Sequence, residues 1–156
     1  MRMHLIAVGK RMPGWVRESF TDYNKRLPGE LHLNLIEITP TVRSKNNPAS
    51  KNISEESKKI KAAIPKGAMI IALDEKGIQL DSPALSKKLE SWSHQGRDIT
   101  FVVGGADGLA DEFKKSADML WSLSSLTLPH ALVRVILVEQ IYRAWTIINN
   151  HPYHRE

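Results

Sequence analysis

The chain has 156 residues, 42% of them hydrophobic and 25% charged, a composition that excludes a disordered or fibrous protein. It has no cysteine, which excludes disulfides, thiolate zinc sites and cysteine nucleophiles, and no uncharged run of 18 apolar residues that would predict a membrane span. Lys and Arg outnumber Asp and Glu by 22 to 17, and the net charge of +5 favours a nucleic-acid partner, although a basic protein without one would look the same. We expect one domain over residues 1–156, in the cytoplasm.

The first forty residues predict two strands around one amphipathic helix. Met3–Val8 is continuously apolar and is followed by a glycine, which is typical of a buried strand. Residues 15–27 place aromatic and aliphatic side chains at spacings of three and four, which predicts a helix packed on the core. Residues 31–38 alternate as a second strand. Lys10 and Arg11 directly follow the first strand, so they are either cations placed at the end of the sheet or solvated turn residues.

The middle of the chain predicts a polar loop, two helices and one buried strand. Residues 39–54 are basic and lack an apolar period, so we expect a mobile loop, which could close on a nucleic-acid backbone. A helix with surface lysines follows over residues 53–64. Residues 69–73 are continuously apolar, as expected for a central strand covered on both faces. Ser82 is the expected cap of a helix that runs to about residue 92.

The last third of the chain completes an alternating order of strands and helices. Residues 99–103 predict a buried strand that runs into the glycine-rich sequence of residues 104–108. A helix is expected over residues 111–119, and residues 123–128 would form a short last strand. This order predicts an α/β fold with a mostly parallel sheet and helices on both faces.

Ligands of parallel sheets bind beyond the carboxyl ends of the strands, and three of these ends are candidates here. They are Leu73–Asp74, Gly104–Gly105 and Leu128–Pro129. The glycines would allow a ligand to approach the backbone closely, or would only form a tight turn. The hydroxyls and peptide groups of residues 122–129 suit a small-molecule pocket, and a solvated strand is the alternative. Neither GxGxxG nor GxxxxGK[ST] occurs, so no dinucleotide or P-loop site is predicted.

The final helix, expected over residues 131–148, is apolar on nearly every face, which indicates burial on more than one side. In a chain of this size, one of those sides is expected to face a second copy of the protein. Glu139 and Arg143 have the spacing of an ion pair on one face of the helix. Arg134 points elsewhere, and an arginine in apolar surroundings needs a carboxylate or a phosphate.

The last residues are rich in side chains that recognise nucleic acids. Tyr and His stack on bases and Arg binds phosphate, so the segment from His151 to Arg155 is either an RNA-contacting tail or a frayed end. His151 and His154 could bind a metal ion, but Pro152 between them spoils the helical spacing. We therefore expect no metal site.

Six segments of the chain resemble the RlmH family of SPOUT-class methyltransferases. They are Leu-Ile-Ala-Val-Gly-Lys at 5–10, Gly-Gly-Ala-Asp-Gly-Leu at 104–109, Leu-Ser-Ser-Leu-Thr-Leu-Pro-His at 123–130, Val-Arg at 133–134, Glu-Gln-Ile-Tyr-Arg-Ala at 139–144 and His-Pro-Tyr-His-Arg at 151–155. The resemblance covers the whole chain and is most specific in the last third. Enzymes of this family methylate N3 of a pseudouridine in bacterial 23S ribosomal RNA.

The resemblance implies a deep C-terminal trefoil knot, S-adenosylmethionine as methyl donor, a homodimer, and 23S rRNA in the ribosome or large subunit as partner. The residues implied to hold the cofactor are Leu73, Gly104, Gly105, Leu123, Ser124, Ser125, Leu126, Thr127 and Leu128. Tyr153, His154 and Arg155 are implied to act in catalysis, beside the cofactor of the partner subunit and in contact with the RNA.

The same resemblance suggests how the reaction would proceed. Arg155 and either Lys10 or Arg11 would hold phosphates, and His154 is a candidate base for the weakly acidic N3 imide. Positioning of the acceptor without a base is the alternative. Two other functions remain open: a non-catalytic ribosome-binding factor, and a nucleotide-binding α/β enzyme, which the missing fingerprints disfavour.

Overall fold

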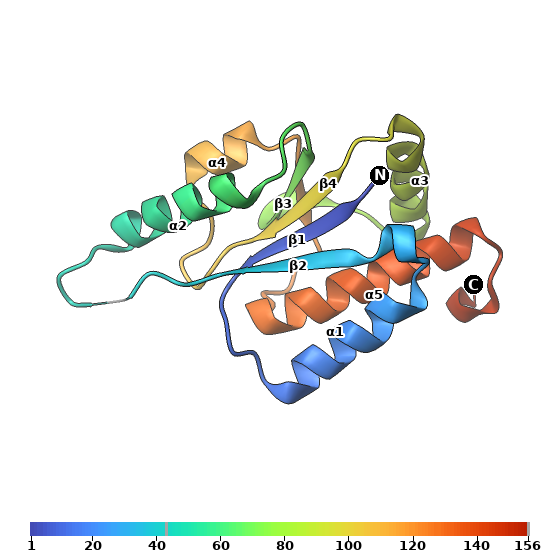
Figure 1. The fold of residues 1–156 in the computed structure, drawn as a ribbon, viewed down its shortest axis with the longest axis horizontal. Coiled ribbons are helices and arrows are strands. Elements are labelled where there is room, and N and C mark those ends of the chain that lie inside the picture. Colours follow the sequence, from blue (N-terminus) through green and yellow to red (C-terminus); the bar gives the residue numbers. More distant parts are fainter. Residues whose placement is uncertain (43, 156) are drawn as a thin grey trace.

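The computed structural model describes residues 1–42 and 44–155 and contains a five-stranded sheet with helices on both faces (Figure 1). Every pairing between the strands is parallel, and the strand order is β2-β1-β4-β3-β5. The strands are β1 (Met3–Val8), β2 (Leu33–Ile38), β3 (Met69–Gln79), β4 (Ile99–Val103) and β5 (Met119–Ser122). The predicted α/β fold with a parallel sheet is confirmed.

The helices divide between the two faces of the sheet. They are α1 (Gly14–Arg26), α2 (Ala49–Ala63), α3 (Ser82–Gln95), α4 (Asp111–Ser116) and α5 (His130–Ile148). Neighbouring residues of β1 show why both faces are covered, because successive side chains of a strand point to opposite sides. Leu5 belongs to the core under α1, α3 and α5, whereas Ile6 belongs to the core under α2 and α4. Figure 1 shows these two helical layers.

The loop before α5 corrects the prediction of a last strand over residues 123–128. The strand that completes the sheet is β5, four residues earlier, and the predicted helix over 111–119 accordingly ends at Ser116. The Ser122 hydroxyl donates to the Ser124 carbonyl at 2.8 Å, and the Ser124 hydroxyl accepts from the Leu126 amide at 2.9 Å. Such local bonds bend the chain away from a ladder, so hydroxyl residues at alternate positions produce a loop.

Three helix and strand boundaries also differ from expectation. Helix α2 begins at Ala49, directly after Pro48, rather than at the predicted Ile53. The prediction missed the first turn because that turn is polar and carries no apolar period. Asp81, not Ser82, caps α3, since its carboxylate accepts from the Ala84 amide at 2.8 Å. Strand β3 continues to Gln79 through a bulge. Of the loop expected over 39–54, Arg43 lies outside the described residues.

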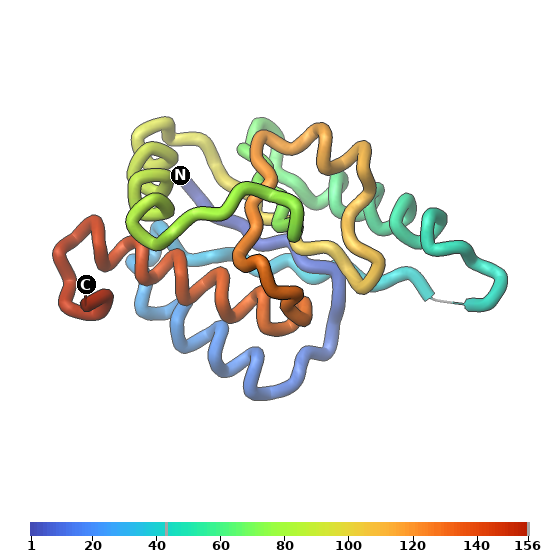
Figure 2. Tube along the Cα trace, turned by 180° about the vertical axis from the view of Figure 1, so that it is seen from behind, coloured from blue at the N-terminus to red at the C-terminus, as the bar shows by residue number. Residues whose placement is uncertain are grey.

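The chain crosses itself beside β5 (Figure 2). In that view the second half of β3 crosses β5, with which it pairs at Trp121 and Ser122. Leu73 and Ile78 both pair with Trp121, which places the bulge of β3 against β5. A Cβ on Gly77 would lie 2.6 Å from the Leu120 carbonyl carbon and the Trp121 nitrogen, so only glycine fits at this contact. The knot that the resemblance implies requires a crossing of this kind, and the knot itself remains a prediction.

Candidate functional site

A pocket opens at the carboxyl edge of the sheet, between the ends of β3 and β4 and the loop before α5. Its walls include all but one of the residues predicted to hold a cofactor: Leu73, Gly104, Gly105, Leu123, Ser124, Leu126, Thr127 and Leu128. The exception is Ser125, whose hydroxyl instead accepts a hydrogen bond from the Gln79 side-chain amide at 2.7 Å. The three segments singled out by the sequence therefore meet in one place, although of the three only Gly104–Gly105 directly follows a strand.

The glycine turn after β4 shapes one wall of the pocket. The Gly108 amide donates to the Gly105 carbonyl at 3.0 Å, and Gly108 has a positive φ of 80°. A Cβ on Gly104 would lie 2.7 Å from the Gly108 carbonyl carbon, so a side chain there would force the turn open. The turn therefore presents backbone rather than side chains to the pocket, which allows a ligand to approach it closely.

The loop of residues 123–128 forms the opposite wall and supplies polar backbone. Among the described residues, its peptide groups make no hydrogen bond to another backbone group. Leu73 and Val103 add apolar surface to the same pocket. Apart from the Ser124 carbonyl and the Leu126 amide, which bond to serine hydroxyls, these amides and carbonyls lie beside apolar walls and suit a ligand with a flat heterocycle and polar ends.

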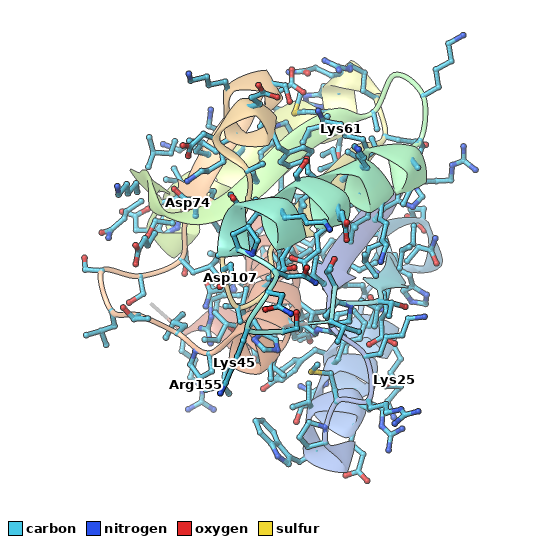
Figure 3. All side chains as sticks on the ribbon, turned by 90° about the vertical axis from the view of Figure 1, so that its left-hand side faces the viewer. Lys25, Lys45, Lys61, Asp74, Asp107 and Arg155 are labelled. Carbon is cyan, nitrogen blue, oxygen red and sulfur yellow. The ribbon has the colours of Figure 1, made fainter. Side chains whose placement is uncertain are left out.

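Acidic residues lie at the mouth of the pocket. Asp74 and Glu75 line it directly after Leu73. The Lys114 ammonium lies 3.6 Å from one carboxylate oxygen of Asp74 and 3.6 Å from one of Asp111. Figure 3 looks onto this edge of the sheet and labels Asp74, in β3, and Asp107, in the turn after β4.

The predicted catalytic tail lies elsewhere, at the carboxyl end of α5. The Tyr153 hydroxyl donates to a carboxylate oxygen of Glu139 at 3.0 Å, and the Tyr153 ring meets the Tyr142 ring edge-on at 4.7 Å between centroids. Burial, followed by the hydrogen bond to Glu139, raises the pKa of Tyr153 above its usual range. Tyr153 is thus a hydrogen-bond donor at neutral pH. Arg143 pairs with Glu139 at 2.6 Å, which confirms the predicted ion pair.

The other two tail residues continue along the same end of α5. His154 Nδ1 lies 3.3 Å from the Thr146 hydroxyl, and Arg155 is exposed. Helix α5 has 19 residues. At 1.5 Å per residue, its two ends are about 28 Å apart. The tail does not line the pocket of its own chain, because the pocket reaches only His130 and Val133 of α5.

Some residues of the pocket were missed by the sequence reasoning. Trp121 lines it from β5, and its role depended on locating that strand correctly. Val133 lines it one helical turn after His130. Helical phase from His130 would have predicted Val133, because residues three apart share a face. Gly108 was part of the glycine-rich sequence but was not singled out.

The part of the chain that the structure describes contains neither a metal-binding cluster nor a membrane-spanning helix. Within residues 1–42 and 44–155, no cluster of three or more His, Asp or Glu side chains has the geometry to hold a metal ion. None of the helices described above has both the length and the apolar character needed to cross a membrane.

The sequence profile described as "Predicted SPOUT methyltransferase" matches residues 1–154 of the chain. The chain belongs to the SPOUT methyltransferase family. As a member of this family it is a methyltransferase. The pocket therefore belongs to a methyl-transfer enzyme.

Similar curated proteins carry the name Ribosomal RNA large subunit methyltransferase H. One from Thioalkalivibrio sulfidiphilus is 51% identical over 156 residues, covering 100% of both chains. Another from Paraburkholderia xenovorans is 52% identical over 155 residues, covering 99% of both. Among solved structures, a probable methylase family protein from Haemophilus influenzae matches with a TM-score of 0.62 and 11% identity, covering 99% of this chain and 70% of that one. At that identity the match shows the SPOUT fold alone.

Proposed function

We propose that this SPOUT methyltransferase transfers a methyl group from S-adenosylmethionine to N3 of a pseudouridine in 23S ribosomal RNA of the large subunit. One observation carries the proposal: the loop of residues 123–128, which the resemblance assigns to the cofactor, lines the pocket with peptide groups that, among the described residues, bond to no other backbone group. The relatives named as large-subunit rRNA methyltransferases match this chain end to end, so both pocket and tail fall within the matched length.

The pocket fits the proposed donor in its chemistry. Peptide groups of residues 123–128 would read the polar edges of the adenine and the methionine portion, and Leu73 and Val103 would cover the flat face of the base. The glycines at 104 and 105 leave room against the backbone. Bound there, S-adenosylmethionine supplies a methyl group that is already strongly electrophilic.

The separation of pocket and tail supports a homodimer as the active form. Tyr153 and His154 dock on α5 at Glu139 and Thr146, whereas the pocket touches that helix only at His130 and Val133. Two copies packed antiparallel along α5 would bring each tail beside the other pocket through one symmetric interface. Leu132, Val135 and Ile136 are only half-buried in a single chain, and they would provide apolar surface for this contact.

In the proposed reaction the tail orients the acceptor. Tyr153 donates its proton to Glu139, so its hydroxyl oxygen would accept a hydrogen bond from an N–H group of the pseudouridine or its neighbours, while Arg155 would hold a phosphate. His154 would accept the N3 proton, unless alignment of the acceptor with the donor suffices.

Mass mapping of ribosomal RNA tests the proposal. We expect 23S rRNA from a strain lacking this protein to lose one methyl group on a pseudouridine. Incubation of those ribosomes with the purified protein and S-adenosylmethionine should restore it. Unchanged rRNA in the deletion strain would contradict the proposal.

A second candidate function is a non-catalytic ribosome-binding factor, which would use the same positive charge. Calorimetric titration with S-adenosylmethionine separates the two. Saturable heat at micromolar protein supports the enzyme, and no heat at saturating ligand supports the binding factor.

A further inference from the structure

Residues 9–13, here named the rim loop, join β1 to α1 and carry two exposed cations. Lys10 and Arg11 are exposed, and among the described residues neither forms an ion pair with a carboxylate. Arg11 has a positive φ of 58°, a conformation that a non-glycine residue holds only when its surroundings impose it. The surroundings of the rim loop therefore fix its backbone.

The rim loop begins beside two walls of the cofactor pocket. A Cβ on Gly105, in the glycine turn, would lie 3.0 Å from a methyl of Val8. A Cβ on Gly9 would lie 3.7 Å from the His130 ring, which also lines the pocket. The two free cations thus leave the sheet at the edge where the donor would sit.

Arg134 holds the start of the rim loop from below. Its side chain is 2% exposed, and one guanidinium nitrogen donates to the Gly9 carbonyl at 2.9 Å. A second nitrogen donates to a carboxylate oxygen of Glu37, in β2, at 2.8 Å. One buried side chain of α5 therefore ties together the ends of β1 and β2. The sequence indicated that Arg134 needs a carboxylate or a phosphate, and the partner in the structure is the carboxylate of Glu37.

Burial of this charge is not explained by stability. A buried ion pair is often no more stabilising than apolar side chains of similar volume, because its desolvation offsets the attraction. The Nε of Arg134 is buried without any partner among the described residues, which adds to that cost. Unlike an apolar side chain, the guanidinium donates a directional hydrogen bond to the Gly9 carbonyl.

We propose that Arg134 is a positioning residue that fixes the rim loop, and that the rim loop presents Lys10 and Arg11 to ribosomal RNA phosphates beside the cofactor pocket. This inference rests on the proposed function and names the protein surface that docks the RNA. Lys10 and Arg11 contact the RNA, whereas Arg134 acts through them.

The primary test is Arg134→Met, which fills the same space without the charge. We expect the KM for ribosomes lacking the methyl group to rise about tenfold, because a loosened loop no longer holds two phosphate contacts in place. The dissociation constant of S-adenosylmethionine, measured by calorimetry, should change less than about twofold. Arg134→Lys should recover part of the loss. Arg97→Met, which removes an exposed arginine that donates to the Gly67 carbonyl at 3.2 Å, is the matched control and should leave both constants unchanged.

Coupling to the rim loop distinguishes positioning from general damage. Lys10→Ala/Arg11→Ala should reduce the slope of log K against log salt for binding to 23S rRNA by about two, which corresponds to the loss of two phosphate contacts. Lys87→Ala/Lys88→Ala, on the exposed side of α3, is the control of equal charge. Adding Arg134→Met to the rim-loop double variant should weaken binding no further, because all three changes remove the same contacts.

The salt titration needs no methyl transfer, so this inference and the proposed function can fail separately. If Arg134→Met does not fold, Glu37→Gln, at a partly exposed position, weakens the same grip and should show the same coupling. Unchanged RNA affinity in either folded variant would overturn the inference. So would losses that add fully to those of Lys10→Ala/Arg11→Ala.

Discussion

The two ends of α5 are built in different ways. At its amino end the pocket consists of turns and peptide groups held in place by close backbone contacts, at Gly104 and Gly77. At its carboxyl end the tail is held by side chains, through the hydroxyl of Tyr153 and its ring contact with Tyr142. The first region has its shape because glycines permit it, and the second because particular side chains meet.

This difference teaches how the two regions should respond to substitution. A backbone-built pocket tolerates many side-chain changes at its surface but fails when a Cβ enters a backbone contact. A side-chain-built tail can be removed or altered without disturbing the sheet, because its hydrogen bonds within the described part of the chain go to α5 and to Tyr23, not to a strand. The proposed function joins the two regions across a dimer.

Gly77→Ala should have the largest effect. Its new methyl group would collide with the backbone of Leu120 and Trp121, which cannot move without breaking the β3–β5 pairing. We expect the free energy of unfolding to fall by about 3 kcal/mol or more, or the chain not to fold. Urea unfolding measures it. Gly29→Ala is the control, because a Cβ at Gly29 would have no neighbour within 4 Å. Equal stability of the two variants would contradict a close contact between Gly77 and the backbone of β5.

Removal of residues 153–156 should abolish methyl transfer and spare the pocket. The tail does not line the pocket of its own chain, because it docks on α5 from Glu139 onward and the pocket reaches only His130 and Val133 of that helix, so S-adenosylmethionine should bind the truncated protein with nearly the same affinity. Calorimetry and a methyl-transfer assay on ribosomes measure the two quantities. Full activity of the truncated protein would remove the tail from catalysis.

Tyr153→Phe should have a smaller effect than truncation. The ring contact with Tyr142 remains, and only the hydrogen bond to Glu139 is lost. We expect kcat to fall about tenfold through poorer positioning and stability to fall by about 1 kcal/mol. The KM for S-adenosylmethionine should stay unchanged, and a rise in that KM with kcat intact would place Tyr153 at the donor instead.

Asp98→Asn should have the smallest effect on stability, and it is a control remote from both regions. Asp98 lies at the amino edge of the sheet, where the hydrogen bond from the Arg2 amide lowers the pKa of the Asp98 carboxyl. Because the pKa is lowered in the folded state, the Asp98 carboxylate adds to the free energy of unfolding above its unfolded pKa of about 4. This contribution is lost as the pH falls through the folded pKa. Asp98→Asn should therefore be slightly less stable at pH 7, with the difference shrinking in acid. Its methyl-transfer activity should be normal.

Periodicity and apolar runs were enough to predict the sheet, because β1 and β4 are buried throughout, β3 is buried at Ile71 and Ala72, and their neighbours are amphipathic helices. They failed where polar side chains bond to nearby backbone. The loop after Ser122 looked like a strand because its hydroxyls alternate, and those hydroxyls are what bend it. The start of α2 was missed because its first turn is polar.

The pocket could be predicted because parallel strands bring their carboxyl ends to one edge. What joins that edge to Arg134 could not be predicted, since Glu37 and Gly9 lie 97 and 125 residues away along the chain. The sequence indicated only that Arg134 needs an anionic partner. The tail was recognised through the resemblance, and its docking on Glu139 became visible only in three dimensions.

Co-expression of two defective chains tests most directly whether pocket and tail from different subunits complete one site. One chain carries Thr127→Arg, which obstructs the exposed pocket loop, and the other lacks residues 153–156. Each alone should be inactive. Random pairing makes half of the dimers mixed, each with one intact composite site, so the mixture should recover about a quarter of wild-type activity. A mixture as inactive as its components would contradict the account.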